Sequence, residues 1–464
     1  MKTTGKILVA VLGTTLFLAG CGKKQPASAW SLDKSEASAQ LKQFLATQEI
    51  QARALAKQEG NKLPSEFDAF YKAAETGDWQ DATNLFQQMR KRLDGDSSLL
   101  GSWWSATLDA YGVFWEFPPG DKYAIAFGNG VIQSIPAGSI YFGGTDPGRF
   151  VVTALMESHA DGKPFFMLSQ NPLADVTYLH YLRAMYGGKI YTPTDEDSQK
   201  SFQDYKTDAQ RRLSHDKQFP NEPRQLKPGE DVRLDSNGQI QMSGQMNVIG
   251  IRELLTKTIF DKNPDREFYI EESFPLDWMY PYLEPHDLIM KINRQPLPAL
   301  SDEIVKQDRD YWTKYVAPMI GDWLNPDTSV AEVAAVAEKV YLKKDFNGFK
   351  GDPRFIQSDD AQKMYSKLRS SIAGVYVWRM RHATDASEKQ RMADAADFAF
   401  RQAFALCPYS PEVVFRYVDF LMGQNRGADA LLVVETAVKM PSMQGEGGQM
   451  RVLAKQLERY RKAK

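Results

Sequence analysis

The alternation of short apolar runs with amphipathic segments in residues 140–292 constrains the fold more than any other feature of this sequence. Residues 140–142 predict a strand that ends in a Gly-Gly-Thr-Asp turn, and residues 165–168 predict a second strand. The segment between them predicts a helix from Pro147 to about Glu157. Since a strand–turn–helix–strand unit is the basis of α/β layers, we expect a central mixed or parallel sheet in an α/β or α+β fold.

Other segments of this middle region are expected to complete the sheet and its covering helices. Asp175 is an expected N-cap for a helix over residues 176–186, and Asn237-Gly238 is the expected turn of a hairpin over residues 232–242. Residues 123–134 fit either a short strand or a helix. The remaining expected elements are strands at residues 190–191, 267–271 and 288–292 and helices at residues 195–213 and 248–261.

Helical patterns flank this region on both sides. On the N-terminal side, residues 66–92 predict a helical hairpin that turns at Gly77. Residues 99–117 predict a further helix with an aromatic stripe. Such a stripe is expected in the core, and a sugar-stacking surface is the alternative.

A spacing of 34 residues marks the C-terminal side, which is helical from residue 302 onward. An Ala-Phe-Ala set recurs there as Ala-Val-Ala, and the two sets are Ala396, Phe400 and Ala403, then Ala430, Val434 and Ala437. This is the period of tetratricopeptide repeats, so we expect about two such repeats. The expected regions are a signal segment (1–20), a flexible tether (21–38), an N-terminal helical region (39–118), an α/β domain (119–300) and a C-terminal helical domain (301–464).

The first residues carry the pattern of a targeting segment. Lys2 and Lys6 precede an apolar run over residues 7–18, and Leu-Ala-Gly then leads directly to Cys21. This arrangement resembles a bacterial lipoprotein signal, which implies cleavage before Cys21 and acylation of that residue. The alternative is an uncleaved anchor, for which the run is short against the ~20 residues of a span. We expect a periplasm-facing lipoprotein of the cell envelope, and Gly22-Lys23, without an aspartate, favours the outer membrane over the inner one.

Composition and motifs exclude several classes of function. The formal net charge is −2, with 57 Lys and Arg residues against 59 Asp and Glu residues, so nucleic acid is not an expected partner. Cys407 is the only cysteine besides Cys21, and its apolar surroundings in the sequence predict a core position. The five histidines lack metal-binding spacings, and no P-loop, G-x-G-x-x-G or G-x-S-x-G motif follows a predicted strand. We therefore expect no metal and no cofactor.

The turn after the first predicted strand carries the first candidate ligand-binding residues, Thr145, Asp146 and Arg149. In one interpretation the turn amides and Asp146 bind a polar ligand with the help of Arg149. In the other, Asp146 caps the following helix and Pro147 takes its first position. The structural interpretation is the favoured one.

Polar residues also follow the next two strands. Gln170 and Asn171 follow the second predicted strand, and Glu272 and Ser273 follow the third. If the strands are parallel neighbours, these groups meet at the edge where open α/β sheets bind ligands. Asp146 and Glu272 would then be a candidate carboxylate pair of the glycosidase kind. The alternative is that loop ends are polar because they are solvated, and we assign no catalytic residue.

Three segments carry a resemblance to one family. They read IYFGGTDPGRF at residues 140–150, FFMLSQNPLADVTYL at residues 165–179 and REFYIEESFPLDWMYPYLEPHDLIMKI at residues 266–292. They resemble the soluble C-terminal part of bacterial membrane proteins related to protein O-mannosyltransferases. In that family an extracytoplasmic α/β domain is often accompanied by tetratricopeptide repeats. The resemblance covers about residues 123–296, and it implies an accessory domain without the membrane spans that would transfer the sugar.

These observations favour a lipid-anchored envelope protein that acts as a non-catalytic interaction or assembly module in envelope glycosylation or secretion. Its expected partners are the membrane, through the lipid, and a protein bound by the helical repeats. The alternative is a glycan-binding protein or a carbohydrate-active enzyme that uses Asp146, Asn171 and Glu272. A purely structural envelope protein is the third hypothesis.

Overall fold

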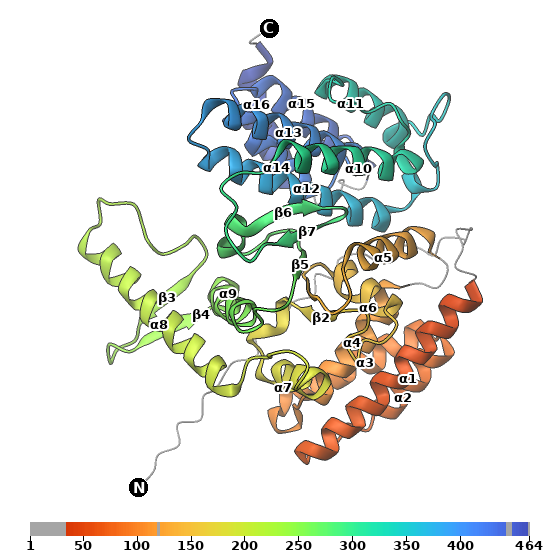
Figure 1. Cartoon of the computed structure of the whole chain (residues 1–464), viewed down its shortest axis with the longest axis vertical. Helices are drawn as coiled ribbons and strands as arrows, with labels where there is room; N and C mark the ends of the chain where they lie inside the picture. The colour runs from red at the N-terminus through yellow and green to blue at the C-terminus, as the bar shows by residue number, and fades with distance from the viewer. Residues whose placement is uncertain (1–33, 118–120, 442–447, 463–464) are drawn as a thin grey trace.

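A small sheet lies between two groups of helices, one from each half of the chain (Figure 1). The structure is a computed structural model that describes residues 34–117, 121–441 and 448–462. It is 65% helical with one small mixed sheet, which places it in the α+β class. No helix in the described ranges is long and apolar enough to cross a membrane. The predicted signal segment and Cys21 lie outside the described residues.

The central sheet has the strand order β2-β1-β5-β7-β6. β1 is parallel to both β2 and β5, whereas β7 runs antiparallel to β5 and to β6. The strands are β1 (Ile140–Gly143), β2 (Phe166–Ser169), β5 (Phe268–Glu271), β6 (Leu283–His286) and β7 (Ile289–Ile292). Every residue of β1, β2 and β5 is buried, as expected for parallel strands that are covered on both faces.

The N-terminal helices form a layer beside the parallel strands. They are α1 (Lys34–Glu59), α2 (Phe67–Thr76), α3 (Trp79–Gly95) and α4 (Trp103–Glu116). Gly77 ends α2 in the left-handed conformation at φ 78°, and the Asp78 side chain accepts a hydrogen bond from the Asp81 amide at the start of α3. This confirms the predicted hairpin. The Tyr111 ring of α4 stacks on the Phe86 ring of α3 at 3.8 Å. Trp103 and Tyr111 of the aromatic stripe are buried in the core. Its other aromatic residues are half-buried and pack against the core, and they are Trp104, Phe114 and Trp115.

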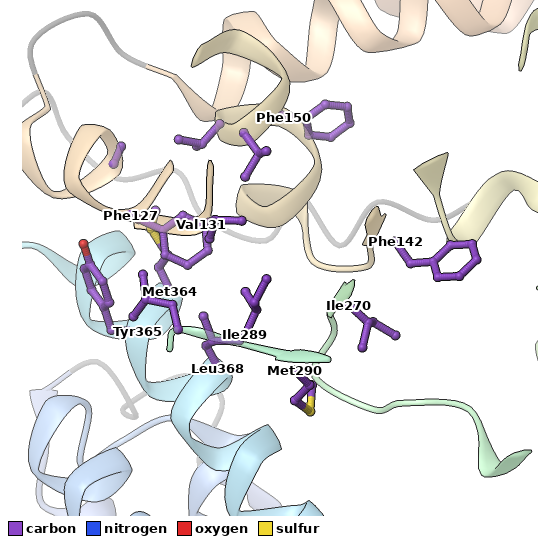
Figure 2. Packing of buried hydrophobic residues seen from close by; sticks show 14 of the residues in the cluster. Phe127, Val131, Phe142, Phe150, Ile270, Ile289, Met290, Met364, Tyr365 and Leu368 are labelled. Atoms are coloured by element: carbon purple, nitrogen blue, oxygen red, sulfur yellow. The ribbon is translucent and has the colours of Figure 1, made fainter. Parts of the chain in front are cut away.

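Helices from distant parts of the chain cover the sheet. Those from the middle region are α5 (Lys122–Ser134), α6 (Val152–Leu155) and α7 (Val176–Tyr186), and a π-helical turn (Pro147–Val151) precedes α6. Figure 2 shows Phe127 of α5 beside Tyr365 and Leu368 of α12 (Asp359–His382), with Ile289 of β7 close by. The two halves of the chain therefore share one core, and the buried apolar cluster extends from Leu41 to Leu457.

An appendage of two helices and a hairpin lies at one side of the sheet region (Figure 1). It consists of α8 (Asp195–Gln218), β3 (Asp231–Leu234), β4 (Ile240–Ser243) and α9 (Gln245–Lys262). β3 and β4 pair in antiparallel register around the predicted Asn-Gly turn. Tyr205, Ala209 and Val232 form a small apolar cluster of its own.

The C-terminal helices pack against β6, β7 and each other. Besides α12 they are α10 (Asp302–Ile320), α11 (Val330–Ala337), α13 (Ala386–Leu406), α14 (Pro411–Gly423), α15 (Gly427–Val438) and α16 (Gly448–Leu457). Arg369 of α12 donates two hydrogen bonds to Asp308 of α10, at 2.8 and 2.9 Å, and both side chains are almost fully buried. Cys407 is fully buried, as predicted.

Two predictions about elements need correction, and one strand was missed. Residues 190–191 are not a strand, because the Tyr191 amide donates to the Asn263 side chain and not to a neighbouring strand. The helix after Pro147 ends at Leu155, before the expected Glu157. β6 was not predicted, since a proline and charged residues interrupt its apolar pattern. The undecided segment 123–134 is helical.

Candidate functional site

The carboxyl ends of the three parallel strands lie level with one another. Gly143, the last residue of β1, is in register with Ser169 on one side and with Glu271 on the other. The strand order therefore brings together the three polar groups that the sequence places after these strands. We expected these polar groups to meet at one edge if the strands were parallel neighbours, and this is confirmed.

Glu271 organises the turn after β1. Its carboxylate accepts hydrogen bonds from the Thr145 amide at 3.1 Å and from the Thr145 hydroxyl at 2.7 Å. The Thr145 hydroxyl oxygen in turn accepts from the Gly148 amide at 3.2 Å. A Cβ atom at Gly148 would lie 1.8 Å from the Glu271 carboxylate, so the close approach requires glycine.

Asp146 does not cap the helix, contrary to the favoured interpretation. It has helical backbone angles and its side chain makes no capping hydrogen bond, because Thr145 takes that role. Among the described residues no group donates to its carboxylate, which is half-buried. Asp146 is therefore the one candidate carboxylate at this edge whose oxygens are not occupied by the turn itself.

Gln170 and Glu272 are in contact with each other and are buried at this edge of the sheet. The Gln170 side-chain amide donates to Glu272 at 3.1 Å, and the Ser273 and Phe274 amides donate to the same carboxylate at 2.7 and 3.3 Å. Gln170 is fully buried and Glu272 is 8% exposed. A Cβ atom at Gly144 would meet the Glu272 carboxylate at 2.0 Å, so the second glycine of the turn also makes room for a glutamate.

Asn171 and Arg149 connect the edge to neighbouring elements. The Asn171 side chain donates to the Gly144 carbonyl at 3.0 Å and accepts from Arg252 of α9. Arg149 is buried and donates to the Ser169 hydroxyl at 3.0 Å. Arg149 thus holds the end of β2 through its Nε–H.

The carboxyl groups of the edge are electrostatically coupled. Burial, with the charge of the adjacent Glu272, raises the pKa of Glu271 to about 7. Burial also raises the pKa of Glu272, and the nearby Arg252 guanidinium opposes that rise. Glu116, at the end of α4, has its pKa raised to about 8 by burial and by the charge of Asp146. Asp146 therefore acts on the pKa of Glu116.

Several residues of this edge come from elements that the sequence did not connect with it. The Ser371 hydroxyl of α12 donates to the Glu272 carbonyl, and Arg416 of α14 donates to the Ser273 carbonyl. The Arg416 guanidinium lies 3.9 Å from the centre of the Phe274 ring, which is 57% exposed. These contacts span about a hundred residues or more, so no local pattern could have indicated them.

The candidate residues of this edge are joined by hydrogen bonds. In the part of the chain that the structure describes, no group of three or more His, Cys, Asp or Glu side chains could hold a metal ion. Thr145, Gln170, Asn171, Glu272 and Ser273 come together, and each makes a hydrogen bond within the edge. Comparison with known proteins gives no family model, no curated protein and no solved structure that matches this chain.

Proposed function

We propose that this chain is a lipid-anchored recognition module of the bacterial cell envelope that binds a ligand at the carboxyl edge of β1, β2 and β5 without chemical turnover. The observation that carries the proposal is the state of the two strand-end glutamates. Glu271 accepts from Thr145, and Glu272 accepts from Gln170 and two backbone amides. Carboxylates held in this way shape a binding surface but are poorly placed to act as nucleophile or base.

The location in the cell envelope that we propose rests on the sequence. The lipoprotein-like segment before Cys21 supports attachment to the envelope through a lipid, with the outer membrane favoured. The resemblance to the accessory domain of mannosyltransferase-related proteins supports a role in envelope glycosylation or secretion. The 34-residue spacing in α13 and α15 supports a second contact, with a protein partner, through tetratricopeptide-like helices.

Crosslinking and affinity capture of the full lipidated protein from its native envelope tests the proposal. Asp146→Asn removes the free carboxylate of the edge, and Asp302→Asn is the matched control, because Asp302 is an aspartate on α10 with a side chain 90% exposed. We expect a specific glycan or glycoprotein with the unmodified protein and the control, and a loss with Asp146→Asn. Recovery of the same material with all three proteins would place recognition elsewhere, and recovery of nothing specific would refute the function.

A second candidate function rests on Glu116 and Asp146. A carboxyl group with its pKa raised to about 8, partly by the charge of an unbonded carboxylate, is a combination that glycoside hydrolysis uses for proton transfer. This function predicts release of 4-nitrophenol from at least one member of a panel of 4-nitrophenyl glycosides. Glu116→Gln should abolish that release, whereas Glu267→Gln, directly before β5, should not. No turnover across the panel by the unmodified protein would count against this candidate.

A further inference from the structure

The β3–β4 hairpin of the appendage is a two-stranded sheet of its own, so β4 has an open outer edge (Figure 1). The Asp235 amide donates to the Gln239 carbonyl at 2.9 Å, which fixes the alternation of hydrogen-bonded pairs along the hairpin. The backbone N–H and C=O groups of Ile240 and Met242 therefore point away from β3. Within the described ranges, no backbone group outside the hairpin pairs with them there.

The chain around this open edge carries no charge. Residues 236–251 contain no Asp, Glu, Lys or Arg, although 25% of the whole chain is charged. Asn247 is the only buried residue among them, so a core position does not explain the lack of charge. Edge strands that face water are usually protected by charged residues or proline, which oppose pairing with another chain. β4 has neither, so nothing in its sequence opposes an added strand.

The appendage also has little core of its own. Its apolar cluster has three fully enclosed members, which are Tyr205, Ala209 and Val232. Ile240 and Met242 are only half-buried against that cluster, and Leu234 of β3 is 43% exposed. A two-stranded sheet is marginally stable by itself, and additional strands contribute hydrogen bonds and apolar cover. The hairpin is therefore suited to being extended by a further strand.

A second copy of this chain supplies a strand that matches this edge. In an antiparallel contact of two β4 strands around a twofold axis, Ile240 lies opposite Met242 of the other copy, and Gln241 lies opposite itself. The hydrogen bonds fit this register, because Ile240 and Met242 are the residues whose backbone groups point outward. A charged residue at the axis would face its own like charge, whereas the neutral Gln241 does not.

We propose that this chain forms a homodimer through β4, in which two hairpins join into one four-stranded antiparallel sheet of order β3-β4-β4-β3. The inference goes beyond the proposed recognition function and does not depend on it, because β3 and β4 belong to a different sheet from β1, β2 and β5.

Disulfide crosslinking in the native envelope tests the dimer on the full lipidated protein. Gln241→Cys places two thiols across the axis, where the Cα atoms of a non-hydrogen-bonded pair lie about 4.5 Å apart, within the range of a disulfide. Cys407 is buried and Cys21 is expected to be acylated, so neither competes. We expect a dimer on mild oxidation, and mass spectrometry should find the two peptides joined at position 241. Gln58→Cys, at an exposed position of α1, is the matched control and should remain monomeric.

Gln241→Lys tests the same contact by charge. The Gln241 side chain is exposed, so the variant should keep the circular dichroism spectrum of the folded protein. In sedimentation velocity of the lipidated protein in detergent, its dimer dissociation constant should rise by about tenfold, because two like charges would face each other. Gln58→Lys adds the same charge on α1 and should leave the dissociation constant unchanged.

Equal crosslinking of Gln241→Cys and Gln58→Cys would overturn the inference, because it would reflect random collision. A disulfide from position 241 to a different protein would also overturn it and would assign β4 to another partner. A protein that is monomeric in both assays, or equal dissociation constants for the two lysine variants, would do the same. Envelope capture with Asp146→Asn would still decide the recognition function separately.

Discussion

Glu271→Gln should change how the stability of this protein depends on pH. Glu271 is 1% exposed and its pKa is about 7, against an ordinary value of 4.5. The difference of about 2.5 pH units, at 1.36 kcal/mol each, corresponds to about 3 kcal/mol of pH-dependent stability. Glutamine keeps the shape, accepts from the Thr145 amide and donates to the Thr145 hydroxyl oxygen, but it does not titrate.

The sign follows from the raised pKa. The folded protein holds a proton on Glu271 that the unfolded chain has already lost above its own pKa of about 4.5. The stabilisation is therefore fully present below pH 4.5 and disappears as the pH rises through about 7. Between pH 5 and pH 8 the unmodified protein should lose up to about 3 kcal/mol through this residue, and the variant should not.

Urea unfolding of both proteins at pH 5, 6, 7 and 8 measures this difference. Glu116 and Glu272 titrate in both proteins, so only the difference between the two curves is interpreted. Glu267→Gln, directly before the same strand, is the control, because the pKa shift of Glu267 has the opposite sign. Its pKa is lowered by Lys291, so its contribution is present above the unfolded pKa and is lost on acidification. Parallel curves for the unmodified protein and Glu271→Gln would refute the reasoning.

Three other substitutions test separate parts of the structure. Gly148→Ala places a Cβ atom 1.8 Å from the Glu271 carboxylate and should lower the free energy of unfolding by about 1–3 kcal/mol. Gly374→Ala in α12 is the control, because open space surrounds this position and the protein should not be destabilised. Arg369→Met leaves Asp308 buried without its partner and should cost about 3–5 kcal/mol in thermal or urea unfolding. Cys21→Ser should move the protein from the membrane fraction to the soluble fraction on immunoblots; retention in the membrane would contradict the lipoprotein prediction.

The elements of the fold were largely predictable because their signals are local. The Gly77-Asp78 pair marks the turn between α2 and α3 by a left-handed cap and an N-cap, and both depend on one or two residues. The Asn237-Gly238 turn of the β3–β4 hairpin is equally local. β6 has no clear apolar pattern, so no local signal predicts it.

The composition of the candidate site was only partly predictable. Gln170, Asn171 and Glu272 follow apolar runs directly, so a rule about strand ends finds them. The prediction that Asp146 caps the helix was wrong, because two adjacent side chains could cap the same turn. Thr145 takes this role, since Glu271 of the neighbouring strand holds its hydroxyl in place. Such a choice depends on the order of the strands, which one sequence does not encode locally.

The remaining residues of the site depend on tertiary structure alone. Arg252 lies on a helix with other charged residues, and nothing in its neighbourhood distinguishes it from a solvated position. Arg416 lies on α14, whose sequence pattern indicates only an amphipathic helix. Their hydrogen bonds to Asn171 and Ser273 become visible only when the sheet and the helices around it are placed together.

The hydrogen bonds that clamp the loop after β5 have a consequence for the order of folding. Ser371 reaches the Glu272 carbonyl across 99 residues of chain, and Arg416 reaches the Ser273 carbonyl across 143. Contacts of such long range form late, because closing a long loop has an entropic cost before any contact compensates for it. As the chain emerges from the ribosome or from an export channel, this edge stays unfinished until α14 has followed. Only a chain that includes α14 would present the completed edge, so products truncated before α14 would lack these two hydrogen bonds or one of them.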